Sequence, residues 1–285
     1  MEDILKVNNI SKSYQDFQLD HVSFSLPKGA IMGLVGRNGA GKSTTLKCIL
    51  NLVNRSSGDI QIFGKDNISA EQEIKERIGV VFEETNFHEV LNAKQISSFM
   101  KDIYKNWDED LFFSYLKKLQ LPKEKALKEF SRGMRMKISL AAAMSHHADL
   151  LILDEPTGGL DPIVRSEILD LFLDFIQDEN KGILLSSHIT TDLEKIADYI
   201  TFIDNGKVVL TESKDEILYS YGVLKGSLSD LSRVNSADII GLHKNQFGFE
   251  ALVKPMDEMK RKYPDMLVDS ASIEEMMLLV AGSKE

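Results

Sequence analysis

A phosphate-binding pattern stands near the start of the chain. Residues 36–43 have the sequence GRNGAGKS, which satisfies G-x-x-x-x-G-K-[ST]. Glycines let the backbone wrap a polyphosphate with its N–H groups pointing at the oxygens, and the following helix presents its positive end to the same anion. Lys42 then reaches the β- and γ-phosphates, and the Ser43 hydroxyl is a ligand for Mg²⁺. The alternative is a glycine-rich turn that binds no ligand. We expect ATP and Mg²⁺ to bind here, with the nucleotide contacted by Gly36, Asn38, Gly39, Ala40, Gly41, Lys42, Ser43 and Thr44.

Two carboxylates follow an apolar run further along the chain. Asp154 closes the segment LLILD at residues 150–154, and Glu155 is the next residue. An unpaired carboxylate at the end of a buried strand is costly, so Mg²⁺ is the natural partner of Asp154, directly or through water. Glu155 can orient and polarise an attacking water, an effect that typically contributes about 10²–10⁴ in rate. An exposed acidic turn is the alternative interpretation. Together with the phosphate-binding pattern, the two carboxylates predict hydrolysis of ATP.

The elements that must position these residues follow an α/β order. Residues 30–35 are apolar on both faces, as expected of a strand buried in a parallel sheet. The helix after the phosphate-binding pattern is expected to stop near residues 56–58. Residues 85–145 change to a helical pattern and predict an inserted helical subdomain. The α/β order then resumes with a strand at 150–155, a helix near 162–177, a strand at 182–186 and a hairpin at 200–210.

The end of the chain predicts a separate folded unit. Chemical motifs are absent from the sequence after about residue 215, but residues 216–285 keep apolar segments and turn residues. Ser272 and Glu275 form a capping box before an apolar helix. We therefore expect one nucleotide-binding domain over residues 1–215 and an accessory, regulatory or dimerisation domain over 216–285.

Composition limits the possible partners. The chain has a net charge of −10, whereas nucleic-acid binders usually present a basic face, so we expect no nucleic-acid partner. The single cysteine, Cys48, excludes an intramolecular disulfide framework and fits a reducing compartment. The N-terminus lacks the pattern of a signal peptide. No apolar run reaches the roughly 18–20 residues needed to cross a bilayer, so a membrane role requires another polypeptide.

The order of further short motifs resembles a known family. Tyr14 stands where the ATPase subunits of ATP-binding cassette (ABC) transporters have an aromatic residue that stacks on adenine. Residues 130–134 (FSRGM) occupy the signature position, which has the sequence LSGGQ in most members. Residues 158–161 (GGLD) resemble the D-loop, and His188 resembles the switch histidine. The resemblance covers residues 4–215. It is carried by these elements in order, since each of them alone would be weak evidence.

The resemblance implies a fold, a site and partners. The expected fold is an α/β P-loop NTPase core of the ABC type, with an antiparallel β-subdomain, a helical subdomain and a small C-terminal appendage. Ser131 and Gly133 would cap the ATP held by an opposite subunit, where Asp161 also contributes. Lys42, Glu155 and His188 would act in catalysis. The partners would be a second ABC ATPase subunit, identical or homologous, and an integral membrane transporter subunit. The chain would work at the cytoplasmic face of the cell membrane.

Two positions depart from the family pattern. Glu83 stands where the Q-loop has a glutamine that contacts Mg²⁺ and senses the membrane subunit. It either keeps the metal contact, as a harder and charged ligand, or is a surface acid. In the signature, Arg132 replaces a glycine and Met134 a glutamine. Arg132 either adds a cation near the facing γ-phosphate or points to solvent.

Finer resemblance suggests a direction of transport. Residues 106–108 (NWD), the FSRGM signature and the C-terminal appendage look like ATPases of Gram-positive exporters, of which those of the phenol-soluble modulin exporter are the nearest type. We therefore expect export of peptides or toxic amphiphiles. A nucleotide-sensing regulator with little or no turnover is the alternative. The retained Glu155 and His188 argue against it. A translation-factor ATPase would normally carry two cassettes, whereas this chain has one. A chromosome-maintenance ATPase would need a long coiled coil, and the helical block at residues 85–145 is too short for it.

Overall fold

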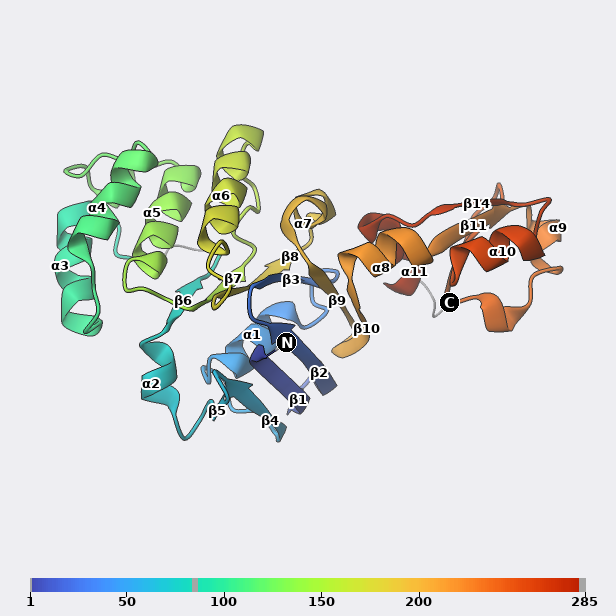
Figure 1. Ribbon diagram of the computed structural model, residues 1–285, viewed down its shortest axis with the longest axis horizontal. Helices are drawn as coiled ribbons and strands as arrows, with labels where there is room; N and C mark the ends of the chain where they lie inside the picture. The colour runs from blue at the N-terminus through green and yellow to red at the C-terminus, as the bar shows by residue number, and fades with distance from the viewer. Residues whose placement is uncertain (1, 84–86, 282–285) are drawn as a thin grey trace.

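Three β-sheets organise the protein in a computed structural model that describes residues 2–83 and 87–281 (Figure 1). The central sheet has the strand order β10-β9-β3-β8-β7-β6. Its strands are parallel except for the edge strand β10, which pairs with β9 in an antiparallel hairpin. The bounds are β3 (Ala30–Val35), β6 (Ile78–Val81), β7 (Leu150–Asp154), β8 (Gly182–Ser187), β9 (Tyr199–Asp204) and β10 (Lys207–Ser213).

The central strands are buried because both faces of the sheet are covered. Every residue of β3, β7 and β8 is buried, which explains their continuous apolar sequences. Helix α1 (Lys42–Ile49) lies against one face, where its Leu46 and Ile49 share a buried cluster with Met32 and Leu34 of β3. The other face carries three helices, seen above the sheet in Figure 1. They are α5 (Arg132–Met144), α6 (Pro162–Phe175) and α7 (Thr190–Ile196).

An antiparallel sheet covers the outer side of α1. It has the order β2-β1-β4-β5 and confirms the expected β-subdomain. Its apolar side chains belong to the same buried cluster as those of α1 and β3, so the helix is sandwiched between two sheets. The bounds are β1 (Asp3–Ser13), β2 (Gln18–Pro27), β4 (Ser57–Ile62) and β5 (Lys65–Asp66), followed by the short helix α2 (Glu71–Lys75).

Helix α1 is shorter than the sequence pattern predicts. It covers Lys42–Ile49, whereas we expected a helix that stops near residues 56–58. Asn51 has φ 54°, the left-handed conformation that commonly ends a helix. The N–H groups of Asn51 and Leu52 donate to the carbonyls of Cys48 and Lys47, at 3.1 and 2.9 Å. These two bonds form a Schellman motif, and the apolar residues that follow belong to the connection to β4.

The expected helical subdomain is present between β6 and β7. It contains α3 (Ala93–Ile103), α4 (Glu109–Lys118), the 3₁₀ turn η1 (Leu127–Glu129) and α5. Asp108 caps α4 by accepting a hydrogen bond from the Leu111 N–H at 2.8 Å, and the acidic Glu109 and Asp110 lie in the first turn, where the helix dipole favours them. The subdomain thus places the start of α5, and with it the signature residues, beside α6.

The C-terminal region forms a third sheet with the order β12-β13-β11-β14. All of its strand pairs are antiparallel, and the order of elements is that of a ferredoxin-like split βαβ unit. The expected capping box is confirmed, because Ser272 Oγ accepts from the Glu275 N–H at 3.1 Å and Glu275 accepts from the Ser272 N–H at 3.0 Å. The bounds are α8 (Lys214–Ser220), β11 (Gly222–Gly226), α9 (Leu228–Leu231), η2 (Ser236–Asp238), β12 (Gly241–Lys244), β13 (Phe249–Val253), α10 (Met256–Lys262), β14 (Leu267–Ser270) and α11 (Ile273–Ala281).

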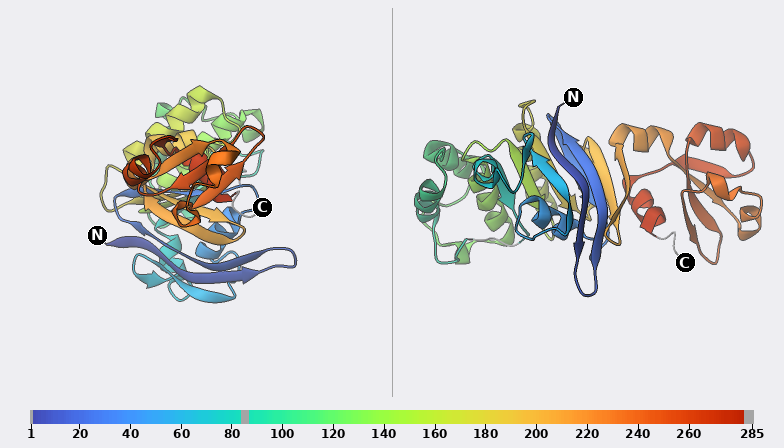
Figure 2. Two further views of the ribbon diagram at one scale, coloured as in Figure 1. Left: turned by 90° about the vertical axis from the view of Figure 1, so that its right-hand side faces the viewer. Right: turned by 90° about the horizontal axis from the view of Figure 1, so that it is seen from below.

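The third sheet lies at one end of the molecule, and the helical subdomain lies at the other (Figure 2). Helix α10 covers one face of the third sheet, and α11 lies between its other face and α7. Met276 and Leu279 of α11 share a buried cluster with Leu193 and Ile196 of α7. The predicted boundary near residue 215 falls inside α8, which joins the two parts.

Candidate functional site

The predicted site residues gather at the carboxyl ends of parallel strands. Strand β3 leads into the phosphate-binding loop, β7 ends at Asp154, and β8 ends one residue before His188. Glu83 follows the end of β6, at the same edge. Parallel strands bring their carboxyl ends to one side of a sheet, which is where ligands bind in open α/β folds. The sheet therefore collects motifs that are far apart in the sequence.

The phosphate-binding loop has the backbone conformation that its glycines allow. Gly41 caps α1 with φ 113°, a conformation that other residues adopt only with strain. A Cβ at Gly36 would lie 2.2 Å from the Ile203 carbonyl oxygen, so a side chain there would force the loop away from β9. The hairpin between β9 and β10 supports the loop from outside, because the Gly206 N–H donates to the Ala40 carbonyl at 2.9 Å.

Lys42 is the buried cation of the loop. Its side chain is 6% exposed, and Nζ donates to the Gly36 carbonyl at 2.8 Å. The same Nζ lies 3.4 Å from Glu155 Oε1. Ser43 is exposed at the start of α1 and Thr44 is half-buried beside it. The lysine thus connects the loop that is expected to hold phosphates with the carboxylate that is expected to activate water.

Glu155 lies between two basic side chains. Its other oxygen, Oε2, is 2.7 Å from His188 Nδ1 and accepts a hydrogen bond from the His188 N–H at 3.3 Å. The Glu155 side chain is 13% exposed, whereas that of His188 is 50% exposed. The structure therefore brings together the three residues predicted to be catalytic. A carboxylate held in this way, beside the lysine that is predicted to bind phosphate, is suited to position a water molecule for attack.

Ser186 is a site residue that the sequence did not reveal. Its hydroxyl donates to Asp154 Oδ1 at 2.5 Å, and Ser186 Oγ accepts a hydrogen bond from the Glu155 N–H at 3.2 Å. The sequence contains one indication of this contact, since both residues stand near the ends of predicted parallel strands. In the structure, the register of β7 and β8 places Asp154 opposite Ser186. The hydroxyl orients one oxygen of the buried Asp154 carboxylate.

The donor set at this edge suits Mg²⁺. That cation is usually bound by one or two carboxylates together with phosphate oxygens, and it prefers oxygen ligands. Asp154 supplies a buried carboxylate and Ser43 an exposed hydroxyl. The third predicted ligand, Glu83, makes an ion pair instead, with its Oε1 3.1 Å from Arg132 Nη2. Within residues 2–83 and 87–281, the other two predicted ligands, Asp154 and Ser43, therefore have no cationic side chain paired with them.

The aromatic residue predicted to meet adenine lies on a turn beside the phosphate-binding loop. Tyr14 is 47% exposed, and its N–H donates to the Phe17 carbonyl at 2.7 Å. The ring of Phe17 packs on the loop, with its tip 2.9 Å from where a Cβ of Gly41 would lie. Lys12 Nζ is 5.3 Å from the centre of the Tyr14 ring. Phe17 thus supports the turn that presents Tyr14.

The signature and D-loop residues cap neighbouring helices. Ser131 Oγ accepts from the Met134 N–H at 3.2 Å at the start of α5, and Asp161 accepts from the N–H groups of Ile163 and Val164 at the start of α6. A Cβ at Gly133 would lie 2.9 Å from a methyl group of Val164. The two helix starts are therefore in close contact, with both capping residues exposed.

Comparison with known proteins agrees with this geometry. The family model described as "ABC transporter" matches residues 19–158. The bacitracin transport ATP-binding protein BcrA of Bacillus licheniformis is 36% identical over 73% of this chain and 69% of its own length. The lantibiotic transport ATP-binding protein SrtF of Streptococcus pyogenes is 34% identical over 74% of this chain and 92% of its own.

The fold agrees as well. A solved ATP-binding subunit of an ABC transporter superposes with a TM-score of 0.69 and 28% identity, covering 75% of this chain and 91% of that one. Among residues 2–83 and 87–281, no helix is both long and apolar enough to cross a membrane. The fold, the order of motifs and the relatives together establish that the chain belongs to the ABC transporter family as an ATP-binding subunit, a family that hydrolyses ATP to power transport.

Proposed function

We propose that this subunit hydrolyses MgATP at the Lys42–Glu155–His188 site and thereby drives export of peptides or other toxic amphiphiles through a separate membrane subunit. The contact of Glu155 with both basic residues carries the catalytic part of the proposal. Export is supported by the two relatives, whose names refer to transport of bacitracin and of a lantibiotic. Both relatives come from Gram-positive bacteria.

Each residue of the site has a distinct role in this proposal. Lys42 and the loop N–H groups hold the phosphates, and Tyr14 stacks on adenine. Glu155 orients the attacking water and accepts its proton, while His188 fixes the Glu155 carboxylate through Nδ1. Mg²⁺, held by Ser43 and Asp154, would neutralise charge on the phosphate oxygens.

We place a second ABC ATPase subunit, identical or homologous, against the face where α5 and α6 begin. Ser131, Gly133 and Asp161 lie at this face, and they are the residues through which the family resemblance assigns contact with the ATP of the opposite subunit. Ile163, in the first turn of α6, is 74% exposed. An apolar side chain of this exposure beside two helix caps is suited to an interface, since removing its apolar surface from water is favourable in proportion to the area that a partner covers.

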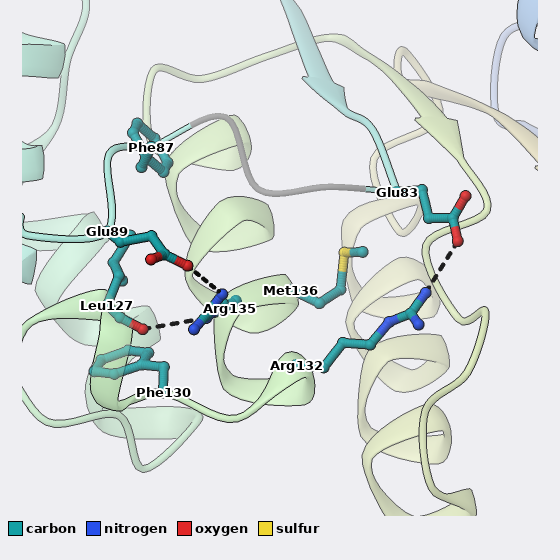
Figure 3. A pocket seen from close by; sticks show the side chains of 8 residues that line it. All are labelled: Glu83, Phe87, Glu89, Leu127, Phe130, Arg132, Arg135 and Met136. Atoms are coloured by element: carbon teal, nitrogen blue, oxygen red, sulfur yellow. Dashed lines mark hydrogen bonds and ion pairs between the residues drawn. The ribbon is translucent and has the colours of Figure 1, made fainter.

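The integral membrane subunit is proposed to contact the region of Glu83, as the resemblance to the Q-loop suggests. A cavity of about 580 Å³ opens beside Glu83 and is lined by residues of the helical subdomain (Figure 3). This partner would hold the ATPase at the cytoplasmic face of the membrane.

No nucleic-acid partner is proposed. Residues 216–285 are proposed to form an accessory domain, which packs against α7 through α11. The nucleotide-sensing regulator finds no support among the relatives.

A comparison of turnover and binding tests the proposal. Glu155→Gln should lower ATP turnover by at least about 100-fold because the proton acceptor is lost, while ATP binding is retained. Lys42→Ala should weaken binding itself. Glu124→Gln is the control, since this carboxylate pairs with Lys94 on the surface of the helical subdomain, 2.6 Å away. Equal turnover of the wild type and Glu155→Gln would overturn the catalytic assignment.

A further inference from the structure

The two departures from the family pattern face each other. Glu83 follows β6 in the core, and Arg132 is the first residue of α5 in the helical subdomain. Glu83 Oε1 lies 3.1 Å from Arg132 Nη2, although the residues are 49 positions apart (Figure 3). The glutamine and glycine that usually occupy these positions could not form an ion pair. The two unusual residues are therefore complementary in charge.

The guanidinium of Arg132 touches a third motif as well. A Cβ at Gly159 would lie 2.7 Å from Arg132 Nη1 and 3.0 Å from Cζ, so the guanidinium rests on the Gly159 backbone. Gly159 lies between Glu155 and Asp161, in the loop that connects the catalytic carboxylate to α6. Arg132 thus joins the signature turn both to the residue after β6 and to the loop after β7. A planar guanidinium with several donors suits such a double contact.

The Arg132 contact affects Glu83 directly. Glu83 is the residue at the Q-loop position, and a carboxylate there is a hard oxygen ligand suited to Mg²⁺. Both side chains are more than half exposed, at 58% for Glu83 and 52% for Arg132. An exposed ion pair of this kind contributes little stability and can be exchanged for another partner. A divalent cation held by ATP and Asp154 is such a partner.

We propose that Arg132 is a positioning residue that competes with Mg²⁺ for the Glu83 carboxylate. Without nucleotide, the ion pair keeps the Glu83 carboxylate on Arg132. When MgATP binds, Glu83 turns to the metal and the Arg132 guanidinium is released, so that it can meet the ATP of the facing subunit. Binding of MgATP in one subunit would thereby change the contact that its signature region makes with the facing subunit. The inference rests on the proposed function, since it requires binding of MgATP.

The dependence of ATP binding on Mg²⁺ tests the inference. The measurement is calorimetric or fluorescent titration of ATP at several Mg²⁺ concentrations, with Glu155→Gln in every variant to prevent hydrolysis. Arg132→Gln should lower the half-saturating Mg²⁺ concentration by up to about fivefold, the range expected for an exposed pair. Arg132→Lys should stay close to the wild-type value because it keeps the charge. In the Glu83→Gln background, Arg132→Gln should have no effect.

A second pair in the same cavity is the matched control. Arg135, also on α5, lies 2.9 Å from Glu89, and both line the cavity beside Glu83 (Figure 3). Arg135→Gln removes a comparable charge without touching Glu83 and should leave the Mg²⁺ dependence unchanged. If wild type and Arg132→Gln bind ATP normally and with the same Mg²⁺ dependence, the proposed competition is wrong but the proposed function still stands. The competition is also wrong if Arg132→Gln shifts the half-saturating Mg²⁺ concentration equally in the Glu83→Gln background. A wild type that binds no ATP would instead overturn the proposed function.

Discussion

At the scale of single residues, the acidic end of β7 depends on Ser186. Asp154 is 7% exposed and ends a fully buried strand, where an unpaired carboxylate would be costly. The Ser186 hydroxyl donates to one of its oxygens and accepts from the N–H of Glu155. Glu155 itself has φ 51°, in the left-handed region. One serine thus orients the Asp154 carboxylate, which is predicted to hold Mg²⁺, and the backbone of the next residue.

Ser186→Ala should therefore weaken the Mg²⁺-dependent part of ATP binding and lower stability. Loss of the hydroxyl leaves a buried carboxylate oxygen without its donor, which costs about 1–3 kcal/mol in the free energy of unfolding. Urea unfolding measures the loss, and ATP titration with and without Mg²⁺ measures the binding. Ser187→Ala is the control, because the Ser187 hydroxyl accepts only from the Ile189 N–H in the contacts found here. Equal Mg²⁺ dependence in both variants would contradict the role of Ser186.

At the scale of elements, the end of α3 meets the end of α5 through a buried histidine. His146 follows α5, is 1% exposed and stacks on Tyr104 with the ring centres 3.9 Å apart. Its Nε2 donates to the Ile78 carbonyl of β6 at 3.0 Å. Burial holds the pKa of His146 below its ordinary value of 6.5, although this hydrogen bond opposes the shift. The contact between the helical subdomain and the core is thus built around a neutral imidazole.

This contact should make stability depend on pH. Below pH 6.5 the unfolded chain binds a proton at His146 that the folded chain resists, so the free energy of unfolding falls as the pH falls. The decrease is at most about 1.4 kcal/mol for each pH unit. His146→Gln keeps a donor but cannot titrate, and it should lessen the difference in urea unfolding between pH 7.5 and 5.5, by about 1 kcal/mol.

The adjacent histidine provides the comparison for this test. His147 is exposed and lies 3.2 Å from Asp108, so His147→Gln removes no buried imidazole and should not lessen the dependence on pH. An unchanged difference between the two pH values in His146→Gln would show that the buried ring does not control acid sensitivity.

The sequence predicted elements whose signals are local and missed those that depend on packing. Apolar runs located β3 and β7. The end of α1 was placed too late because Leu50 and Val53 continue the apolar pattern, whereas the left-handed Asn51 ends the helix. The pairing order of the third sheet has no sequence motif, since it joins four short strands across intervening helices.

The same distinction holds for the site. The motif order predicted the meeting of Lys42, Glu155 and His188, because each residue follows a strand of one parallel sheet. The Glu83–Arg132 pair was not predicted, and the two outcomes expected for Arg132 were a facing phosphate or solvent. Its partner depends on how the helical subdomain packs on the core, which no short sequence pattern encodes.

At the scale of the whole molecule, the third sheet is placed to influence His188, which resembles the switch histidine of the family. Helix α11 packs on α7, which begins two residues after His188. On its other side α7 meets α6 through Asp192, which is 2% exposed and lies 3.7 Å from Arg165 Nε. Separating the buried Asp192 carboxylate from its partner cation would be costly, so α6 and α7 should move together. Helices α6 and α7 thus link the accessory region and His188 to the face proposed for the second subunit.

That face should determine association in the presence of ATP. Ile163 is 74% exposed in the first turn of α6, beside Asp161, and closure of a dimer would bury it. Ile163→Glu would place an unpaired charge in the interface and should raise the dimer dissociation constant at least about tenfold, equivalent to about 1.4 kcal/mol. Sedimentation of the Glu155→Gln background with MgATP measures the constant. Phe247→Glu is the control, because Phe247 is 84% exposed at the turn between β12 and β13, on the third sheet. Equal dissociation constants for the two variants, with ATP binding intact in both, would place the second subunit elsewhere.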